Sequence, residues 1–171
     1  MVIRQETKED YDKIYQFVKT AFETAKVSDG KEQDFVSRLR NSKNYIPELS
    51  FVMEQNDEIT GYIMLSKTIV RNENGSFGTL LLAPLCIGEK RRNNGIGGRL
   101  LGYAVKKAEE MGYKSIFLAG DRNYYRRFGF VPASEYGIKC QYDLPENLLD
   151  NIMALEIIPG SLEGVSGIVE L

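Results

Sequence analysis

The chain contains no histidine and no tryptophan, and only two of its 171 residues are cysteines. Without histidine it can build neither a Ser-His-Asp nor a Cys-His catalytic group, and it lacks the commonest metal ligand of proteins. Cys86 and Cys140 are too few for a thiolate metal cluster and too far apart for a Cys-x-x-Cys redox pair. We therefore expect no metal, and any chemistry must come from carboxylates, tyrosines, backbone dipoles or a bound cosubstrate.

Long apolar runs are also absent. The longest, Leu80–Ile87, is far shorter than the ~20 residues that span a bilayer. The charged segment Arg4–Asp12 follows the first three residues directly, which does not resemble a signal peptide. Hydrophobic residues make up 43% of the chain, enough to bury one core. We expect a cytoplasmic protein with a single domain, residues 1–171, and no membrane partner.

The net charge is −2, which argues against a nucleic-acid partner because no excess of cations is present to bind phosphates. The positive charges nevertheless gather in two places. One cluster comprises Lys90, Arg91, Arg92 and Arg99, and the other comprises Arg122, Arg126 and Arg127. Two small basic clusters in an acidic chain indicate a local anionic ligand, although ordinary surface charge would give the same pattern.

Apolar spacing predicts strands and helices in mixed order. A strand at Val2–Gln5 precedes helices at Lys8–Glu23 and near Lys31–Arg40, with a polar break at Val27–Lys31 between them. Turn signals at Asn56-Asp57-Glu58 and Asn74-Gly75 separate three strands of an antiparallel meander, Leu49–Gln55, Ile59–Arg71 and Phe77–Gly88. Pro84 has no N–H to donate, so we expect a bulge or a local parting of strands there.

The glycine-rich turn Asn93–Gly98 opens the most amphipathic helix, which Gly112 ends. One face of this helix carries Ile96, Leu100, Leu101, Ala104, Ala108 and Met111. A strand at Ser115–Ala119 follows, and strand–helix–strand order implies a right-handed crossover with parallel pairing. Further on, we expect one or two helical turns at Asn123–Arg127 and a late strand through Met153, Leu155 and Ile157.

The segment Arg92-Asn93-Asn94-Gly95-Ile96-Gly97-Gly98 has the features of a phosphate-binding loop, although a tight strand–helix turn would look similar. Amides at a helix N-terminus are unpaired and attract anions, and glycines permit close approach. A Walker A loop would end in Gly-Lys-Ser/Thr, where this chain has Gly97-Gly98-Arg99. A dinucleotide fingerprint would need glycine in place of Leu100. The residues therefore fit neither ATP nor NAD.

Arg92-x-x-Gly95-x-Gly97 resembles the Gln/Arg-x-x-Gly-x-Gly/Ala motif of the GNAT superfamily of acyl-CoA N-acyltransferases. Downstream, Tyr125–Phe130 is similar to the Tyr-x-Lys/Arg-x-Gly-Phe signature of that family. The longer runs Gly120–Pro132 and Pro159–Val165 resemble the branch of YhbS-like predicted N-acetyltransferases. Glu89 stands where the family often has proline. An asparagine of the later strand is absent, which leaves one pantetheine contact open.

The resemblance covers nearly the whole chain and implies the GNAT fold. This is an α/β (α+β) fold with a central mixed sheet of six to seven strands, an antiparallel meander, a parallel and splayed pair formed by the fourth and fifth strands, and helices on both faces. It also implies acetyl-CoA as cosubstrate. Leu85, Cys86 and Ile87 would bind the pantetheine, with one amide near Ile87 polarising the thioester carbonyl, while Arg92, Asn93, Asn94, Gly95, Ile96, Gly97 and Gly98 would hold the pyrophosphate. Arg91, Lys90, Arg126 and Arg127 all remain candidates for the 3′-phosphate.

Tyr125 occupies the position of the family's tyrosine, so the resemblance assigns it cofactor binding and protonation of the leaving thiolate. An aromatic packing role would also fit its neighbours. The proton acceptor for the amine is open among Glu48, Glu54, Glu73, backbone carbonyls and water. Cys86 has no histidine partner, so we expect direct attack in a ternary complex rather than an acyl-cysteine.

We therefore expect an N-acetyltransferase that acts on a primary amine of a small molecule or peptide. Two alternatives stay open, namely a non-catalytic acyl-CoA-binding regulatory module on the same fold and a nucleotide-binding phosphate-loop protein. The acceptor is not specified by the sequence, and arylalkylamines, polyamines, aminoglycosides, amino acids and protein N-termini are all compatible. A homodimer is as compatible with the sequence as a monomer.

Overall fold

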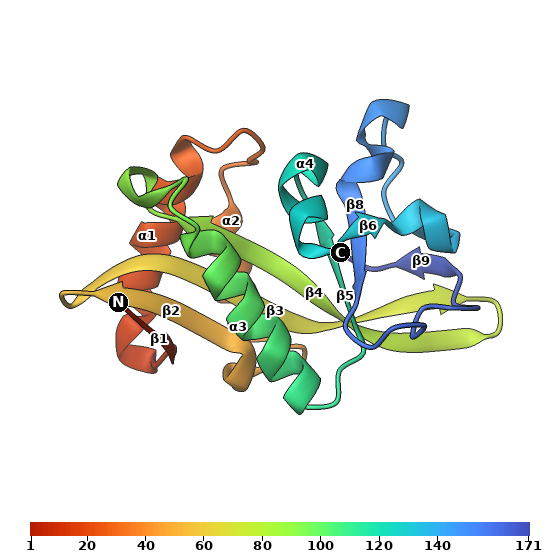
Figure 1. Cartoon of the computed structure of the whole chain (residues 1–171), viewed down its shortest axis with the longest axis horizontal. Helices are drawn as coiled ribbons and strands as arrows, with labels where there is room; N and C mark the ends of the chain where they lie inside the picture. Colours follow the sequence, from red (N-terminus) through yellow and green to blue (C-terminus); the bar gives the residue numbers. More distant parts are fainter. The chain divides into compact units, whose positions relative to one another are not determined.

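The computed structural model describes all residues from 1 to 171, and the chain divides into two compact units. Unit 1 comprises Met1–Ser66 and Ala83–Lys107, and unit 2 comprises Lys67–Leu82 and Ala108–Leu171. The chain passes from one unit to the other within strand β3 (Glu58–Asn72), strand β4 (Gly75–Ile87) and helix α3 (Ile96–Glu110), which Figure 1 labels. The single domain expected from the chain length stays a prediction. None of the helices has the length and apolar character that crossing a bilayer requires.

Antiparallel strands form the centre of unit 1. Strand β1 (Val2–Gln5) pairs with β2 (Ser50–Gln55), and β2 pairs with the first part of β3. The turn between β2 and β3 has positive φ angles of 52° at Asn56 and 62° at Asp57, a conformation that short polar side chains tolerate. The first half of the predicted meander is therefore present at the predicted turn.

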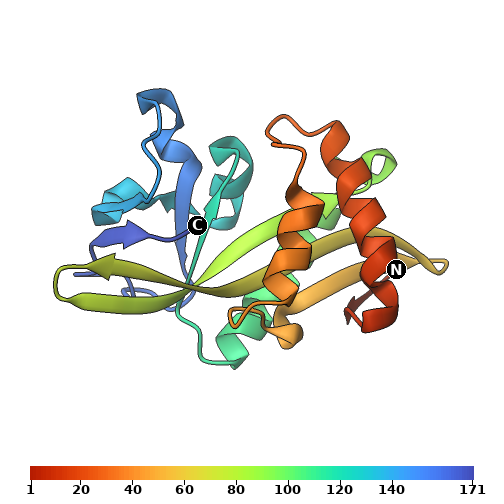
Figure 2. The same cartoon turned by 180° about the vertical axis from the view of Figure 1, so that it is seen from behind.

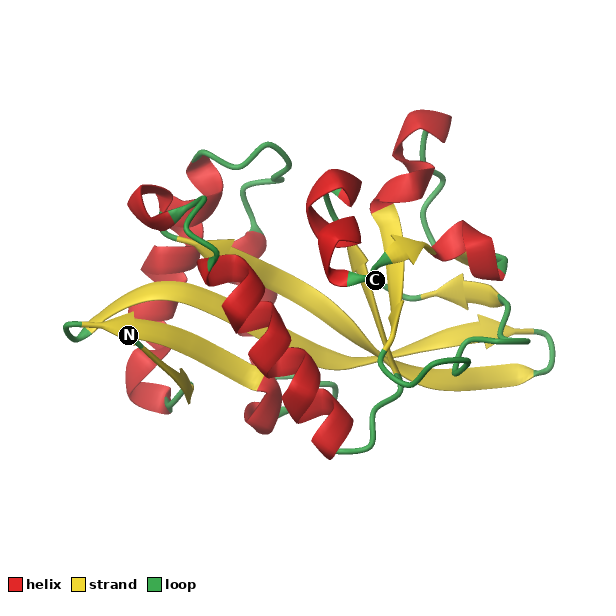
Figure 3. Ribbon diagram, in the orientation of Figure 1, coloured by secondary structure: helices red, strands yellow, loops and turns green.

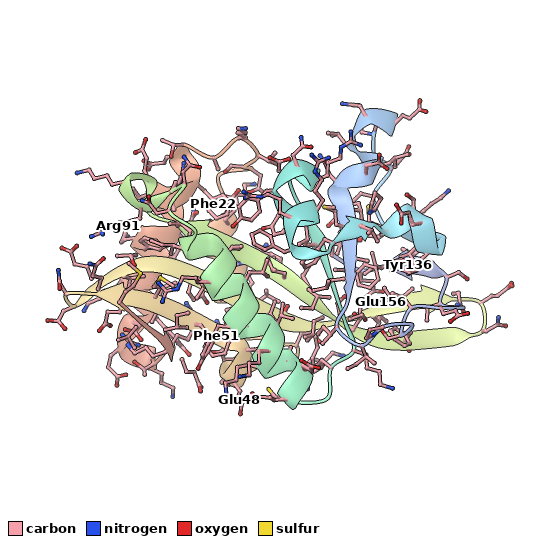
Figure 4. All side chains as sticks on the ribbon, in the orientation of Figure 1. Phe22, Glu48, Phe51, Arg91, Tyr136 and Glu156 are labelled. Carbon is pink, nitrogen blue, oxygen red and sulfur yellow. The ribbon has the colours of Figure 1, made fainter.

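Helices cover both faces of the sheet in unit 1. Figure 1 shows α3 in front of the strands, and Figure 2 shows α1 (Tyr11–Glu23) and α2 (Glu32–Arg40) on the opposite side. The alternation of side chains along a strand explains this arrangement. Val52, Tyr62, Met64 and Cys86 pack with Ile14, Val18 and Ala21 of α1 and with Val36 of α2. On the α3 side, Phe51, which Figure 4 labels, meets Tyr103 edge to face, with ring centroids 5.0 Å apart.

The helix after the glycine turn buries most of the face that the sequence predicts. Ile96, Leu100, Leu101, Ala104 and Ala108 are buried. The prediction for Met111 is wrong, since its side chain is 44% exposed. Helix α3 ends at Glu110, and Gly112 has a φ of +86°, so Met111 lies in the turn and no longer on the buried stripe.

A buried ionic network fastens α2 to the sheet in unit 1. Arg40 donates to both carboxylate oxygens of Glu6 at 3.0 and 2.6 Å, and both side chains are buried. The hydroxyls of Tyr45 and Tyr62 donate to the same carboxylate at 2.7 and 2.9 Å. Burial opposes the charge of Arg40, but the bonds to Glu6 outweigh it and raise the arginine pKa above its ordinary value. All partners are satisfied, so the network serves the fold.

Unit 2 contains the remaining strands. Strand β4 pairs in parallel with β5 (Ser115–Ala119) through Leu80–Ile116 and Leu81–Phe117. Strand β5 pairs antiparallel with β8 (Ile152–Glu156), which also pairs with β6 (Val131–Pro132). Strand β9 (Gly167–Val169) pairs with β3 and with β7 (Ile138–Cys140). Figure 3 shows that short helical turns separate these strands: α4 (Arg122–Tyr125), η4 (Arg126–Phe128), η5 (Ala133–Tyr136) and η6 (Glu146–Asn151).

Along the sheet the hydrogen-bonded order is β1-β2-β3-β4-β5-β8-β6, with β7 and β9 attached through β3. The predicted mixed sheet, its parallel β4/β5 pair and its helices on both faces are confirmed. The predicted number of six to seven strands is too low, because the sheet has nine strands, of which β6, β7 and β9 are only two or three residues long. The splay of β4 from β5 stays a prediction, because it concerns strand ends that belong to different units. Strand β4 continues through Pro84, which follows a cis Ala83–Pro84 peptide bond.

Candidate active site

The glycine turn lies between β4 and α3 in unit 1. A single helical turn, η3 (Glu89–Arg91), follows β4, and the amide of Arg99 donates to the Gly95 carbonyl at 3.1 Å. That bond is the first of the helix, so the amides of its first turn have no carbonyl before them to bond. Gly95 has a φ of +73° and no atom within 4 Å of an added Cβ, so its backbone angle and not crowding requires glycine there.

Arg92 is engaged with backbone carbonyls at the other end of the loop. Its Nε donates to the Ile87 carbonyl at 3.3 Å, Nη1 to Thr24 at 3.3 Å and Nη2 to Ala21 at 2.5 Å. Ala21 and Thr24 lie at the C-terminal end of α1, where helix carbonyls lack internal partners and a cation is favourable. Arg92 therefore ties the loop to α1, a function that the motif alone did not indicate.

The other residues of the two basic clusters differ in whether they contact neighbouring side chains. Arg127 in unit 2 stacks on Tyr124 and Phe128 at 4.7 and 5.4 Å from the ring centroids, and Arg122 pairs with Asp150 at 2.8 Å. In unit 1, Lys90 is exposed, and Figure 4 places Arg91 on the outer side of the loop. Lys90, Arg91, Arg126 and Arg127 therefore all stay candidates for binding the 3′-phosphate of CoA.

The end of β4 carries the three residues expected along the pantetheine. Leu85 and Ile87 are half-buried and alternate with Cys86, whose thiol is buried against the α1 and α2 side. Burial is the main cause that raises the pKa of the Cys86 thiol well above its ordinary value, despite the opposing charge of Arg92. Such a thiol is a poor nucleophile, which supports the expectation of direct transfer.

Tyr125 closes helix α4 in unit 2. Asp121 caps this helix through the Asn123 amide at 2.9 Å. The Tyr125 ring lies 5.0 Å from the ring of Tyr124 and 5.6 Å from that of Phe130. An ideal Cβ on Gly120 would lie 2.7 Å from its ring atom Cε2. Neighbouring residues therefore restrict the position of the Tyr125 ring. This is expected both if the ring serves packing and if its hydroxyl is positioned for catalysis.

The three carboxylates proposed from sequence as proton acceptors have other surroundings. Glu54 accepts two hydrogen bonds from Arg4, at 3.0 and 2.5 Å. Glu48 is exposed in η2 (Pro47–Leu49), and Figure 4 shows it far from Arg91 and the loop. Glu73 is exposed in the turn between β3 and β4. Glu54 is therefore engaged by Arg4, and Glu48 and Glu73 lie on the surface.

Sequence reasoning missed Glu32, the first residue of α2. Its Oε1 accepts the Asp29 amide at 3.0 Å, while Oε2 is buried with no hydrogen-bond partner in the chain. The N-cap of α2 is Lys31, which makes no side-chain capping bond, so the bond between Asp29 and Glu32 belongs to the loop before the helix. No sequence signal reports that one carboxylate oxygen is buried and unpaired.

A hollow of about 410 Å³ opens beside the end of α1 in unit 1. It is lined by Lys19, Phe22, Glu23, Ala25, Lys26, Ser28 and Gly30, and Figure 4 labels Phe22. Ser28 and Gly30 of this lining belong to the polar break Val27–Lys31 between the first two helices. No group of three histidine, cysteine or acidic side chains in the chain is placed to hold a metal ion.

Comparison with known proteins identifies the family. The model of the acetyltransferase (GNAT) family matches residues 11–130. The uncharacterized N-acetyltransferase YjhQ of Escherichia coli K12 is 30% identical over 125 residues, which cover 72% of this chain and 69% of YjhQ. The chain therefore belongs to the acetyltransferase (GNAT) family, whose members are acyltransferases.

Two solved structures are similar to this chain over most of its length. The GNAT family N-acetyltransferase YhbS from Escherichia coli, in complex with CoA, is 25% identical with a TM-score of 0.85, over 99% of this chain and 88% of that one. A GNAT family acetyltransferase from Brucella melitensis, in complex with acetyl-CoA, is 28% identical with a TM-score of 0.73, over 92% of this chain and 88% of that one. The predicted YhbS-like branch and GNAT fold are confirmed.

Proposed function

We propose that this protein transfers the acetyl group of acetyl-CoA to a primary amine of a small molecule or peptide. The observation that carries the proposal is the start of α3, where Gly95 turns the backbone and the amides of the first helical turn have no internal partner. Such a helix start binds phosphate, and relatives of the same fold carry CoA or acetyl-CoA. Asn93–Gly98 would hold the pyrophosphate, and Arg92 would keep this loop against α1.

Leu85, Cys86 and Ile87 would lie along the pantetheine, with the Ile87 amide as the proposed donor to the thioester carbonyl. We assign Tyr125 the protonation of the departing thiolate, because a phenol with a pKa near ~10 is only somewhat less acidic than a thiol. The buried Cys86 has no part in acyl transfer. Attack by the amine is therefore direct, within a ternary complex.

An amine panel tests the reaction. Purified protein is incubated with acetyl-CoA and phenethylamine, spermidine, kanamycin, alanine or a short peptide, and free thiol is measured. We expect thiol release with at least one amine, and intersecting double-reciprocal plots. Parallel plots together with a trapped acetyl-cysteine would overturn direct attack.

Two glycine variants test the binding loop. Gly95→Ala and Gly112→Ala both place alanine at a positive φ in open space, so each should destabilise the fold by a similar amount, about 1–2 kcal/mol. Only Gly95 lies at the start of α3, so only Gly95→Ala should weaken acetyl-CoA binding in calorimetry. Equal affinities for the two variants would remove the loop from the binding site.

The alternative is a non-catalytic module that binds acyl-CoA for regulation. It makes a distinct prediction, namely calorimetric binding of acetyl-CoA with no thiol release from any amine of the panel.

A further inference from the structure

Strand β3 contains a bulge at Thr60. In the pairing of β2 with β3, Met53 lies opposite Gly61 and Glu54 lies opposite Ile59, so Thr60 has no residue opposite it. Thr60 is nevertheless buried, and its hydroxyl donates to the Met53 carbonyl at 3.2 Å. A bulge of this kind bends its strand and often lies next to an active site, where it changes the direction of neighbouring groups. The bulge therefore needs an explanation beyond the pairing of β2 with β3.

The bulge lies directly beside the end of β4 in unit 1. The Gly88 amide donates to the Thr60 carbonyl at 3.1 Å. At the other end of the same peptide group, the Ile87 carbonyl accepts a hydrogen bond from Arg92 Nε at 3.3 Å. The peptide group between Ile87 and Gly88 is thus held on both sides. Because successive amides of a strand point to opposite edges, the Ile87 amide points away from β3, as a donor to the thioester carbonyl must.

Gly61, the residue after the bulge, makes room for the side chain of Ile87. An ideal Cβ on Gly61 would lie 2.9 Å from Ile87 Cδ1, closer than real Cβ atoms approach. It would also lie 3.3 Å from Leu100 Cδ2 and 3.4 Å from Met53 Cβ, so the space around it on this face of the sheet is filled. Gly61 has no positive φ angle, so close approach and not backbone conformation requires glycine there. Ile87 therefore packs directly on the backbone of β3.

We propose that Gly61 is a positioning residue, which sets the place of the Ile87 amide and thereby of the thioester carbonyl. The inference rests on the proposed function, in which this amide polarises that carbonyl. The bulge supplies the Thr60 carbonyl that holds the Gly88 amide, and Gly61 gives the Ile87 side chain its place on the sheet. Leu100, in the second turn of α3, packs at the same point. The contact therefore also relates the reacting end of acetyl-CoA to the helix that would bind its pyrophosphate.

A double-mutant cycle on the full-length protein tests this contact. Gly61→Ala adds a methyl group that must displace Ile87, and Ile87→Val removes the Cδ1 atom that this methyl group would meet. The cycle comprises wild type, the two single variants and the double variant. Gly102→Ala, in open space on α3 of the same unit, is the control. We measure thermal unfolding, acetyl-CoA affinity by calorimetry, and kcat and KM for the panel amine with the highest wild-type turnover.

We expect Gly61→Ala to lower kcat by about 10- to 100-fold, because a small displacement of a group that contacts the reacting carbonyl is costly. Acetyl-CoA affinity and KM for the amine should stay within about twofold of wild type, since the amide acts mainly in the transition state. In the Ile87→Val background the same change should lower kcat by less than about threefold, because the displaced atom is absent. Gly102→Ala should match wild type.

Two results would overturn the inference and leave the proposed function intact. If Gly61→Ala changes only the unfolding temperature and kcat keeps its wild-type value, the contact serves the fold alone. If kcat falls by the same factor in both backgrounds, the loss does not act through Ile87. A wild-type protein that releases no thiol with any amine of the panel would instead overturn the proposed function, and this inference with it.

Discussion

Tyr125 carries the most specific chemical assignment at the scale of single residues. Replacing it with phenylalanine keeps the ring contacts to Tyr124 and Phe130 and removes only the hydroxyl. If that hydroxyl protonates the thiolate, turnover should fall by about 10- to 1000-fold while acetyl-CoA affinity is retained. Steady-state kinetics and calorimetry measure the two quantities. Unchanged turnover would return Tyr125 to a packing role.

Gly120 tests whether the position of that ring matters. A Cβ at Gly120 would lie 2.7 Å from Tyr125 Cε2, closer than real Cβ atoms approach, so Gly120→Ala must displace the ring. We expect turnover to fall by about 10- to 100-fold, because small misplacements of reacting groups are costly. Gly78→Ala, also in unit 2 but in open space, is the control. Full activity in Gly120→Ala would mean that the ring position is not critical.

The tie between the glycine loop and α1 belongs to the scale of elements. Arg92→Met removes three hydrogen bonds to backbone carbonyls and should destabilise the protein by about 1–3 kcal/mol in urea unfolding. Arg92→Lys keeps the charge but cannot reproduce the planar set of donors. If Arg92 acts mainly through these hydrogen bonds, both variants should be less stable than wild type. A lysine variant as stable as wild type would mean that the positive charge alone accounts for the stabilisation.

The ion pair between β1 and the turn before α1 should make the free energy of unfolding depend on pH. Arg4 binds Asp10 through two bonds, at 2.7 and 2.9 Å, and these bonds are the main cause that lowers the Asp10 pKa to about 2. A lowered folded-state pKa stabilises the protein above the unfolded value of 3.8, and this stabilisation is lost as the pH falls towards about 2.

Asp10→Asn should therefore be less stable than wild type by roughly 1–2 kcal/mol at neutral pH, and the difference should shrink between pH 4 and pH 2. Urea unfolding across this pH range measures it. The exposed Asp12→Asn on α1 is the control. A difference that stays constant with pH would assign the loss to packing.

At the scale of the whole molecule, binding of the cosubstrate should stabilise the native chain. Acetyl-CoA at 100 times its dissociation constant should add about 2.7 kcal/mol, because it binds the folded and not the unfolded protein. A thermal shift assay with acetyl-CoA, ATP and NAD measures this. A shift with ATP or NAD and none with acetyl-CoA would favour a nucleotide-binding protein instead.

Much of the fold could be predicted from local patterns. The strand Ser115–Ala119 has the predicted bounds, because a short apolar run between a helix stop and a glycine is distinctive. Strands β6, β7 and β9 escaped prediction, since runs of two or three residues show no periodicity. The loop and Tyr125 were singled out through motifs, and their roles stay predictions. The tie made by Arg92 and the unpaired oxygen of Glu32 depend on residues distant in sequence, which no local pattern reports.

Gly167 begins the last strand, and an added Cβ there would lie 2.2 Å from the carbonyl oxygen of Arg71 on β3. Its φ of +132° is equally unsuited to a side chain. Every relative that keeps this strand register must therefore keep glycine at this position, whatever amine it acetylates. If Gly167 is invariant among homologues, the reason is therefore the close packing of β9 against β3, and the invariance does not indicate which substrate is used.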